Sequence, residues 1–367
     1  MNRFKKFSAL GLTLVVGLAA CDDAAGPGSD ADGPFNPVTS AADFQAVESA
    51  FDTPVFASLG AMSGSFSHIN GAPALASTLL DAGWDLATAG ESWQLQEAGN
   101  RVAGALYSSS AAALLIPESF RGRTYVYYPE QGYHYDAERT GAPATGMRFI
   151  LYEVNPVTHD PGTTEIGYVD ILDESTDASL VARLVVVSDG TEYMNYTVSA
   201  SGLIGSVSFG VSGFITDGTD QVDLDLTTSF SSTFASERAE ISYTIGVPTR
   251  DFDLTASLVM EFERETDLGS MTVDVQFSEG SNSVRFQGSF AITEQEAGTL
   301  EVLVNGELFA TITMEGDSFS IAGPNGEALS AEHAQALRDM MDGFEVLFDD
   351  TFEDFIRPVS WLFQFGD

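Results

Sequence analysis

The sequence predicts a mainly β protein with helices (α+β): a large antiparallel meander sheet, curled or shaped as a half-barrel, with N-terminal helices and one long C-terminal amphipathic helix. Three observations predict it. From residue 124 onward, apolar residues recur with the period of two that a strand with one buried face requires. Turn pairs such as Asp189-Gly190 and Asn305-Gly306 separate these runs. After Ser330 the apolar period changes to that of a helix.

Composition limits the classes of function. The chain has 367 residues, a net charge of -39 from 54 acidic and 15 basic residues, and one cysteine. This length suits one large β domain or two ordinary domains. Such a negative charge repels phosphates, so we expect neither nucleic-acid binding nor docking of a basic patch on anionic lipids. One cysteine excludes a disulfide scaffold, a thiolate zinc site and an iron–sulfur cluster.

The first 20 residues have the layout of an export signal: a basic start, an apolar stretch over residues 7–20 and small residues at its end. The apolar stretch is shorter than the about 20 residues that a membrane-spanning helix needs. Its end, Leu18-Ala19-Ala20-Cys21, resembles the lipobox of bacterial lipoproteins, and the resemblance covers only residues 1–21. It implies that residues 1–20 are removed and that Cys21 is lipidated, which anchors the chain to a membrane. The alternative is a free cysteine within an ordinary signal or membrane helix.

Removal of the signal makes the net charge more negative. It takes away three of the 15 basic residues and no acidic ones, so 12 basic residues remain against 54 acidic ones and the net charge becomes -42. Both lysines, Lys5 and Lys6, are lost, and every remaining cationic side chain except histidine is an arginine. A GC-rich genome would account for this, and so would a saline habitat, where salt screens the repulsion of an acidic surface. We expect the protein in the bacterial cell envelope, at the outer membrane or the periplasmic face.

The mature chain divides into three regions. Residues 21–39 hold the lipidated cysteine and a tether rich in Asp, Ala, Gly, Ser and Pro. Residues 40–118 form a helical segment, in which Pro54 interrupts the first helical pattern and residues 74–84 and 102–115 are further short helices. Residues 119–367 form the antiparallel β domain, closed by a helix over about 331–357.

Strands are predicted first where Val, Ile, Phe and Tyr are dense, over 147–153, 166–172, 180–187, 193–200 and 203–215. From residue 207 the alternation is regular, with Ser, Thr and Asp opposite the apolar residues. The apolar sets are Val207, Phe209, Val211 and Ile215; Val222, Leu224, Leu226 and Phe230; Phe252, Leu254, Ala256, Leu258, Met260 and Phe262; Met271, Val273, Val275 and Phe277; and Val284, Phe286 and Phe290. One polar and one apolar face require the sheet to curl or to be covered on one side.

The predicted C-terminal helix begins at a Ser330 cap and ends before Pro358. Its wide apolar stripe indicates packing on the inner side of the sheet rather than on a membrane. The stripe consists of Leu337, Met340, Met341, Phe344, Leu347, Phe348, Phe352, Phe355 and Ile356.

Residue patterns for catalysis are nearly absent, so we expect no enzyme. The four histidines have no zinc-protease spacing; they are His68, His134, His159 and His333. His134 lies among tyrosines at 125, 127, 128, 133 and 135, a pattern that an exposed sheet edge and a ligand platform explain equally well. Gly316-Asp317-Ser318 resembles the nucleophile block of a lipolytic hydrolase family over three residues only.

No cofactor is predicted, apart from a weak calcium candidate around one turn. It consists of Asp217, Asp220, Asp223 and Asp225. Carboxylates suit Ca²⁺, but the glutamate that would complete an EF-hand loop is missing, and a solvated acidic face is the simpler interpretation.

Two functions follow, with a third kept open. In the first, a non-enzymatic, membrane-anchored envelope lipoprotein binds a lipid or other hydrophobic ligand within the curled sheet, which looks like the half-barrel lipoprotein carriers of bacterial envelopes. In the second, the core is filled, and a structural or surface-interaction lipoprotein uses its acidic face to bind cations or a partner. The third is an outer-membrane β-barrel or a hydrolase.

Overall fold

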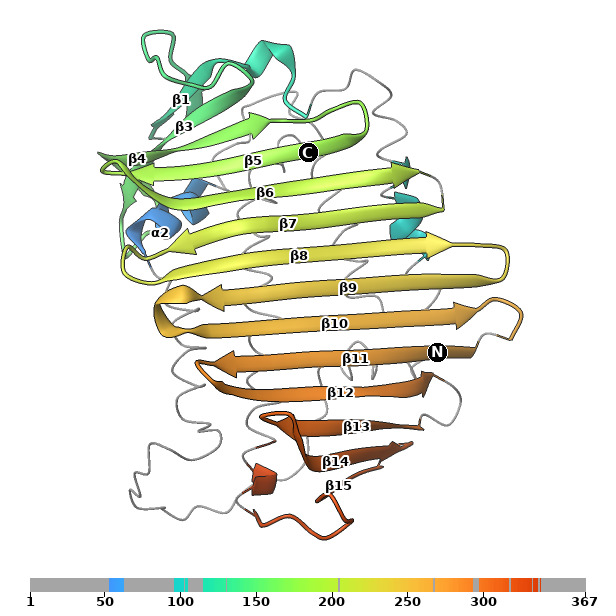
Figure 1. The fold of residues 1–367 in the computed structure, drawn as a ribbon. Helices are drawn as coiled ribbons and strands as arrows, with labels where there is room; N and C mark the ends of the chain where they lie inside the picture. Colours follow the sequence, from blue (N-terminus) through green and yellow to red (C-terminus); the bar gives the residue numbers. More distant parts are fainter. Residues whose placement is uncertain are drawn as a thin grey trace, which may run out of the picture.

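The described part of the protein forms one open sheet of 15 strands (Figure 1). From one edge to the other the order is β15-β14-β13-β12-β11-β10-β9-β8-β7-β6-β5-β4-β3-β1-β2. Each pair of consecutive strands from β3 to β15 is antiparallel, which confirms the predicted meander. The computed structural model describes residues 53–62, 96–101, 103–104, 115–129, 131–203, 205–266, 268–292, 297–316, 318–331, 333–335 and 337.

The strands up to β8 are β1 (Arg123–Tyr128), β2 (Gly132–Tyr135), β3 (Gly146–Val154), β4 (Pro161–Asp173), β5 (Ser179–Ser188), β6 (Thr191–Leu203), β7 (Ser206–Thr216) and β8 (Gln221–Ser232). The others are β9 (Ser236–Val247), β10 (Phe252–Glu263), β11 (Leu268–Glu279), β12 (Asn282–Ile292), β13 (Ala297–Val304), β14 (Glu307–Glu315) and β15 (Ser318–Ala322). The short helices are α2 (Pro54–Met62), η3 (Glu118–Phe120) and η4 (Pro248–Arg250).

The turn residues explain the tight connections. Asp189 and Gly190 both have positive φ angles, 49° and 79°, and so do Asn305 and Gly306, at 51° and 83°. Two successive positive φ angles define the hairpin turn whose twist matches that of its strands. These Asp-Gly and Asn-Gly pairs are therefore turns, as the sequence predicts.

One predicted strand is wrong in extent. The sequence predicts a single strand over 203–215, but β6 ends at Leu203 and β7 begins at Ser206. Gly205 has a φ of 86°, a conformation open to glycine that disfavours other residues. The turn is hidden in the sequence because its glycine stands inside an apolar run.

The sheet has one apolar and one polar side, which we call the inner face and the outer face. Inner-face side chains such as Val186, Ile215, Val222 and Ile245 are 0% exposed. The predicted alternation is confirmed in strands β7 and β8, whose apolar residues are buried and whose Ser, Thr and Asp residues lie on the opposite face. Each such Val, Leu or Ile contributes roughly 1.5–3 kcal/mol when fully buried, so this face dominates the stability of the sheet.

Helix α2 packs on the β3–β4 end of the sheet. The Thr53 hydroxyl accepts a hydrogen bond from the Phe56 N–H (3.2 Å), and Pro54 is the first helical residue. Proline is well tolerated there, so Pro54 begins a helix rather than only interrupting one. The buried Ser58 hydroxyl accepts a hydrogen bond from the Tyr152 N–H (3.0 Å), which ties α2 to β3.

A second helical stretch covers residues 96–101 and 103–104 and lies against β8. A Cβ atom added to Gly99 would lie 2.4 Å from Cδ1 of Phe230, whose side chain is buried. The helix backbone therefore approaches the inner face closely because residue 99 has no side chain.

The long C-terminal helix predicted over about 331–357 is not supported. Helical backbone is described only at positions 331, 333–335 and 337, where the Ser330 hydroxyl accepts a hydrogen bond from the His333 N–H (3.1 Å), as a cap does. The rest of that prediction lies outside the described residues. So do the export signal, Cys21, the tether, the first helical pattern before residue 53 and the predicted helix over 74–84.

The close approach of Gly99 is testable against Gly104, which has no neighbouring atom within 4 Å of an added Cβ. We expect Gly99→Ala to destabilise the protein by about 1–3 kcal/mol, because the added methyl group overlaps the buried Phe230 ring and forces the helix or the ring to shift. Gly104→Ala should be neutral or stabilise by up to about 1 kcal/mol through helix propensity. Urea denaturation measures both, and equal effects of the two substitutions would contradict the contact.

Candidate functional site

The outer face carries a line of hydroxyl groups that crosses eleven strands. Paired residues from β5 to β15 fall on one row, which we call the hydroxyl row, and nine of its eleven members are Ser or Thr. All are exposed or half-buried. The members are Ser179, Ser201, Ser208, Ser229, Glu240, Val259, Thr272, Ser289, Thr299, Thr313 and Ser320.

Neighbouring strands lie about 4.8 Å apart, so the hydroxyl row is a regular array of hydrogen-bonding groups. Carboxylates accompany it on the same face. Some are paired with arginines across strands: Arg148 with Asp170 (2.7 Å) and Arg285 with Asp274 (2.5 Å). The exposed carboxylate of Asp225 has no such pairing among the described residues. This surface can bind cations and polar groups.

The four aspartates of the calcium candidate lie on the β7–β8 hairpin. Asp217 and Asp220 belong to the turn, whereas Asp223 and Asp225 lie on the outer face of β8. Oδ1 of Asp217 accepts hydrogen bonds from the backbone N–H groups of Thr219 (2.6 Å) and Asp220 (2.8 Å). That oxygen therefore stabilises the turn itself.

Asp220 is directed toward η4. Oδ1 of Asp220 accepts a hydrogen bond from the Thr249 hydroxyl (2.6 Å), and Oδ2 accepts one from Nη2 of Arg250 (3.0 Å). These two donors hold the pKa of Asp220 below its usual value. Within the described ranges, no group of three or more Asp, Glu, His or Cys residues could hold a metal ion. Calcium binding at this hairpin stays a prediction, and an ion there would compete with Arg250.

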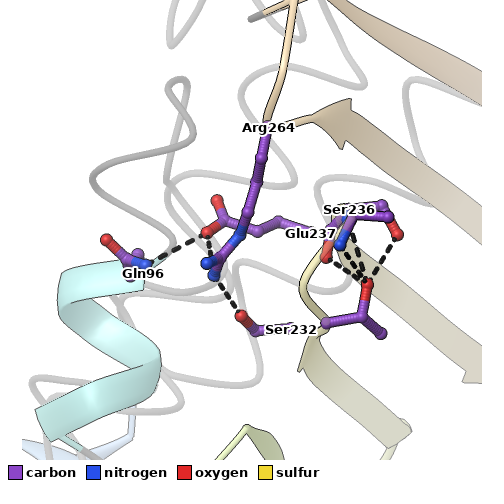
Figure 2. Close-up of polar contacts among 7 residues, drawn as sticks. Gln96, Ser232, Ser236, Glu237 and Arg264 are labelled. Atoms are coloured by element: carbon purple, nitrogen blue, oxygen red, sulfur yellow. Dashed lines mark hydrogen bonds and ion pairs between the residues drawn. The ribbon is translucent and has the colours of Figure 1, made fainter.

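A buried carboxylate that the sequence did not predict lies at the start of β9 (Figure 2). Glu237 is only 3% exposed, and its Oε1 accepts hydrogen bonds from Nη2 of Arg264 (2.7 Å) and Nε2 of Gln96 (3.2 Å). The same Arg264 nitrogen also bonds the Ser232 hydroxyl. This cluster links the 96–104 helix to the ends of β8, β9 and β10, so its role is to position the helix.

A second buried carboxylate lies at the start of the sheet. The Asp173 side chain is buried, and its Oδ2 accepts hydrogen bonds from Nη2 of Arg121 (2.8 Å) and from the Ile116 N–H (3.2 Å). Arg121 also donates to the Ile116 carbonyl oxygen (3.0 Å). The pair fixes the path by which the chain enters β1. Both buried acids could have been suspected from the sequence, because each occupies an inward phase of an alternating run.

The tyrosines of β1 and β2 come together as an aromatic cluster. The Tyr125 ring stacks on Phe149 at a centroid distance of 4.9 Å, and the Tyr133 ring meets Phe149 edge-on at 5.5 Å. The buried Tyr133 hydroxyl donates to the Ile150 carbonyl oxygen (2.7 Å), and burial raises the pKa of Tyr133. Most of this cluster is core, whereas Tyr135 and Tyr128 remain exposed at the edge.

The histidines of the described chain are dispersed. A ring nitrogen of His134 lies 2.8 Å from the Gln131 carbonyl oxygen inside its own hairpin, and His333 meets the ring of Phe309. His159 adopts a φ of 58° in the β3–β4 turn. The structure does not bring these three residues into one site, and His68 lies outside the described residues.

The three-residue resemblance to a lipolytic hydrolase falls at the β14–β15 turn. The Ser318 hydroxyl donates to the Glu315 carbonyl oxygen (2.8 Å), which is the geometry of a turn, and Asp317 lies outside the described residues. A serine nucleophile needs a base within hydrogen-bonding reach, and among the described residues no histidine or carboxylate side chain forms a hydrogen bond with the Ser318 hydroxyl. No helix in that part is long and apolar enough to cross a bilayer.

Comparison with protein-family models, with curated proteins and with solved structures finds no match to this chain. The interpretation of its surfaces therefore depends on its own residues.

The Glu237 cluster can be tested against an exposed ion pair one residue further along β9. We expect Arg264→Gln to destabilise the protein by about 1–3 kcal/mol, because it removes the charge of Arg264 from beside the buried Glu237 carboxylate. Arg238→Gln removes a cation that pairs with the exposed Glu261 and should cost less than about 1 kcal/mol. Thermal and urea denaturation measure both, and similar losses would mean that burial of Glu237 is energetically unimportant.

Proposed function

We propose that this protein is a non-enzymatic, lipid-anchored lipoprotein of the cell envelope that acts as a structural or surface-interaction protein. The observation that carries the proposal is the contrast between the two faces. Inner-face side chains are buried along the sheet, whereas the outer face presents the hydroxyl row and its carboxylates to solvent.

The burial of the inner face favours a filled core over a large cavity. A side chain that lines an empty space as wide as a lipid keeps accessible surface toward that space. Leu184, Ile215, Ile245 and Leu254 are all 0% exposed, and they come from four different strands. These positions therefore cannot line such a space, which supports the second of the two functions predicted from the sequence.

The charge of the outer face selects its partners. A net charge of -39 for the full chain repels anionic polymers at low salt, so a partner should carry positive charge or bind through hydrogen bonds alone. Hydroxyl groups at strand spacing favour an extended partner over a compact one. Because such an interaction is partly electrostatic and exposed, it should weaken as salt screens it.

The predicted lipid anchor determines where the domain acts. Lipidation at Cys21 would hold the domain at a membrane, and the acidic tether of residues 22–39 would keep the sheet away from anionic headgroups. No catalytic role is part of this function.

A second candidate is a curled or half-barrel sheet that binds an apolar ligand, and one observation favours it. Leu258 of β10 and Val273 of β11 are paired inner-face residues, yet both keep part of their surface accessible. Gly288 of β12 pairs with Val273 and places no side chain beside them. An acyl chain could occupy this stretch of the inner face.

Native mass spectrometry of the protein purified from its own membrane separates the two functions. We expect a covalent mass of acyl groups that is absent in Cys21→Ser, and no additional non-covalent ligand. If the second candidate is correct, a ligand mass accompanies the wild-type protein. That mass should disappear in Leu258→Gln and persist in Val259→Gln, whose adjacent side chain lies on the outer face. A Cys21→Ser protein that still requires detergent would contradict the anchor.

Binding to the outer face can be measured with a hexa-arginine peptide as the probe. We expect the double variant Asp225→Asn/Glu301→Gln to weaken binding at least threefold at low salt, because both carboxylates are exposed on this face. The control, Asp177→Asn/Asp189→Asn, removes the same charge from the β4–β5 and β5–β6 turns, at the ends of strands. Equal weakening by both variants would show that the peptide senses only net charge, and the face would not be an interaction surface.

A further inference from the structure

Arg123, at the start of β1, stands apart from the other arginines. Eight arginines of the described chain form ion pairs with Asp or Glu: Arg121, Arg139, Arg148, Arg183, Arg238, Arg250, Arg264 and Arg285. Arg123 is half-buried, and within the described part it pairs with no carboxylate. In a chain with 54 acidic residues, a guanidinium that no carboxylate occupies needs an explanation.

The Arg123 guanidinium is positioned by an aromatic ring instead. Its Cζ lies 4.7 Å from the centroid of Tyr135, which belongs to the edge strand β2 and is 47% exposed. A cation–π contact uses the flat face of the guanidinium and leaves the N–H groups at its edge available. Stacking therefore holds the side chain in place without consuming its hydrogen-bond donors.

The neighbouring Tyr125 hydroxyl lies behind the guanidinium of Arg123. Tyr125 lies opposite Tyr135 in the β1–β2 pair, its side chain is 3% exposed, and its hydroxyl is buried. Burial raises the pKa of Tyr125, whereas the positive charge of Arg123 and a side-chain hydrogen bond with Arg123 lower it. A cation backed by a buried hydroxyl thus lies at the open edge of the sheet.

We propose that Arg123 and Tyr135 form a binding site for the carboxylate group of a small organic acid, with the buried Tyr125 behind the guanidinium. The two oxygens of a carboxylate match two parallel N–H groups of a guanidinium. The exposed Tyr135 ring offers an apolar surface to the carbon skeleton beside that carboxylate.

Among anions, the negative charge of the whole protein opposes a monoanion less than a dianion. Long-range repulsion by the acidic surface grows with ligand charge, so it opposes a phosphate dianion about twice as strongly as a carboxylate. Asp136, which follows Tyr135 in the sequence, is already engaged: its Oδ1 accepts a hydrogen bond from the Glu138 N–H (2.9 Å), and its Oδ2 lies 4.0 Å from Arg139. It therefore does not neutralise Arg123.

Calorimetric or NMR titration of the mature protein tests this site with three probes: glucuronate, glucose, which lacks the carboxylate, and inorganic phosphate. We expect saturable glucuronate binding at millimolar levels or below, weaker phosphate binding and no glucose binding. Arg123→Gln should weaken glucuronate binding at least tenfold. Arg123→Lys should weaken it less, because lysine keeps the positive charge but lacks the two parallel N–H groups of the guanidinium. Tyr135→Leu should weaken it at least threefold.

Arg183→Gln is the matched control, because Arg183 is an exposed, ion-paired arginine of β5, away from this edge. Melting curves establish that each variant is folded. No saturable glucuronate binding, equal binding of glucose, tighter binding of phosphate, or equal loss in Arg123→Gln and Arg183→Gln would each overturn the proposal.

Discussion

The structure depends on one constraint: an open sheet of 15 strands has one apolar face, and that face must be removed from water. In the part of the chain that the structure describes, β2 and β15 end the sheet and each pairs with one described strand only, so the sheet is not closed. Both edge strands are short, which limits the backbone groups available for pairing with another chain. Most apolar side chains of the inner face are buried from β3 to β14, with Leu258 and Val273 partly accessible. The hydrophobic effect along this face is therefore what makes so long a meander stable.

The two buried acids follow from that constraint. A carboxylate on the apolar face is costly unless a cation and further donors meet it. Glu237 has Arg264 and Gln96, and Asp173 has Arg121 and a backbone N–H. In both cases the partner comes from a segment outside the strand, so the charge specifies where that segment lies. An apolar side chain of similar size could bury a similar area without fixing the position of that segment. The two acids thus fix the positions of their partner segments, which the hydrophobic effect alone would not define because it is non-directional.

Local patterns predict the meander well, because alternation and turn chemistry are properties of neighbouring residues. Asp189-Gly190 and Asn305-Gly306 carry their turn geometry in two residues. Long-range features are different. The hydrogen bond between Gln96 and Glu237 joins residues 141 positions apart, and the spacing of residues in neither segment predicts it. Gly205 shows a further limit, since an apolar run concealed its turn. The predicted C-terminal helix was inferred from spacing alone, and spacing does not identify the surface against which a helix packs.

The distribution of arginines connects stability with binding. Most described arginines neutralise a carboxylate on an otherwise strongly acidic protein, and several do so across adjacent strands of the outer face, where such pairs reduce repulsion between like charges. Each arginine used in this way is occupied. Arg123 is stacked on Tyr135 instead, at the β2 edge of the sheet. Its guanidinium pairs with no carboxylate among the described residues, and this is the condition under which a small anion can bind without breaking an existing ion pair. On an acidic protein, a binding site for an anion is therefore best sought at an arginine that pairs with no carboxylate.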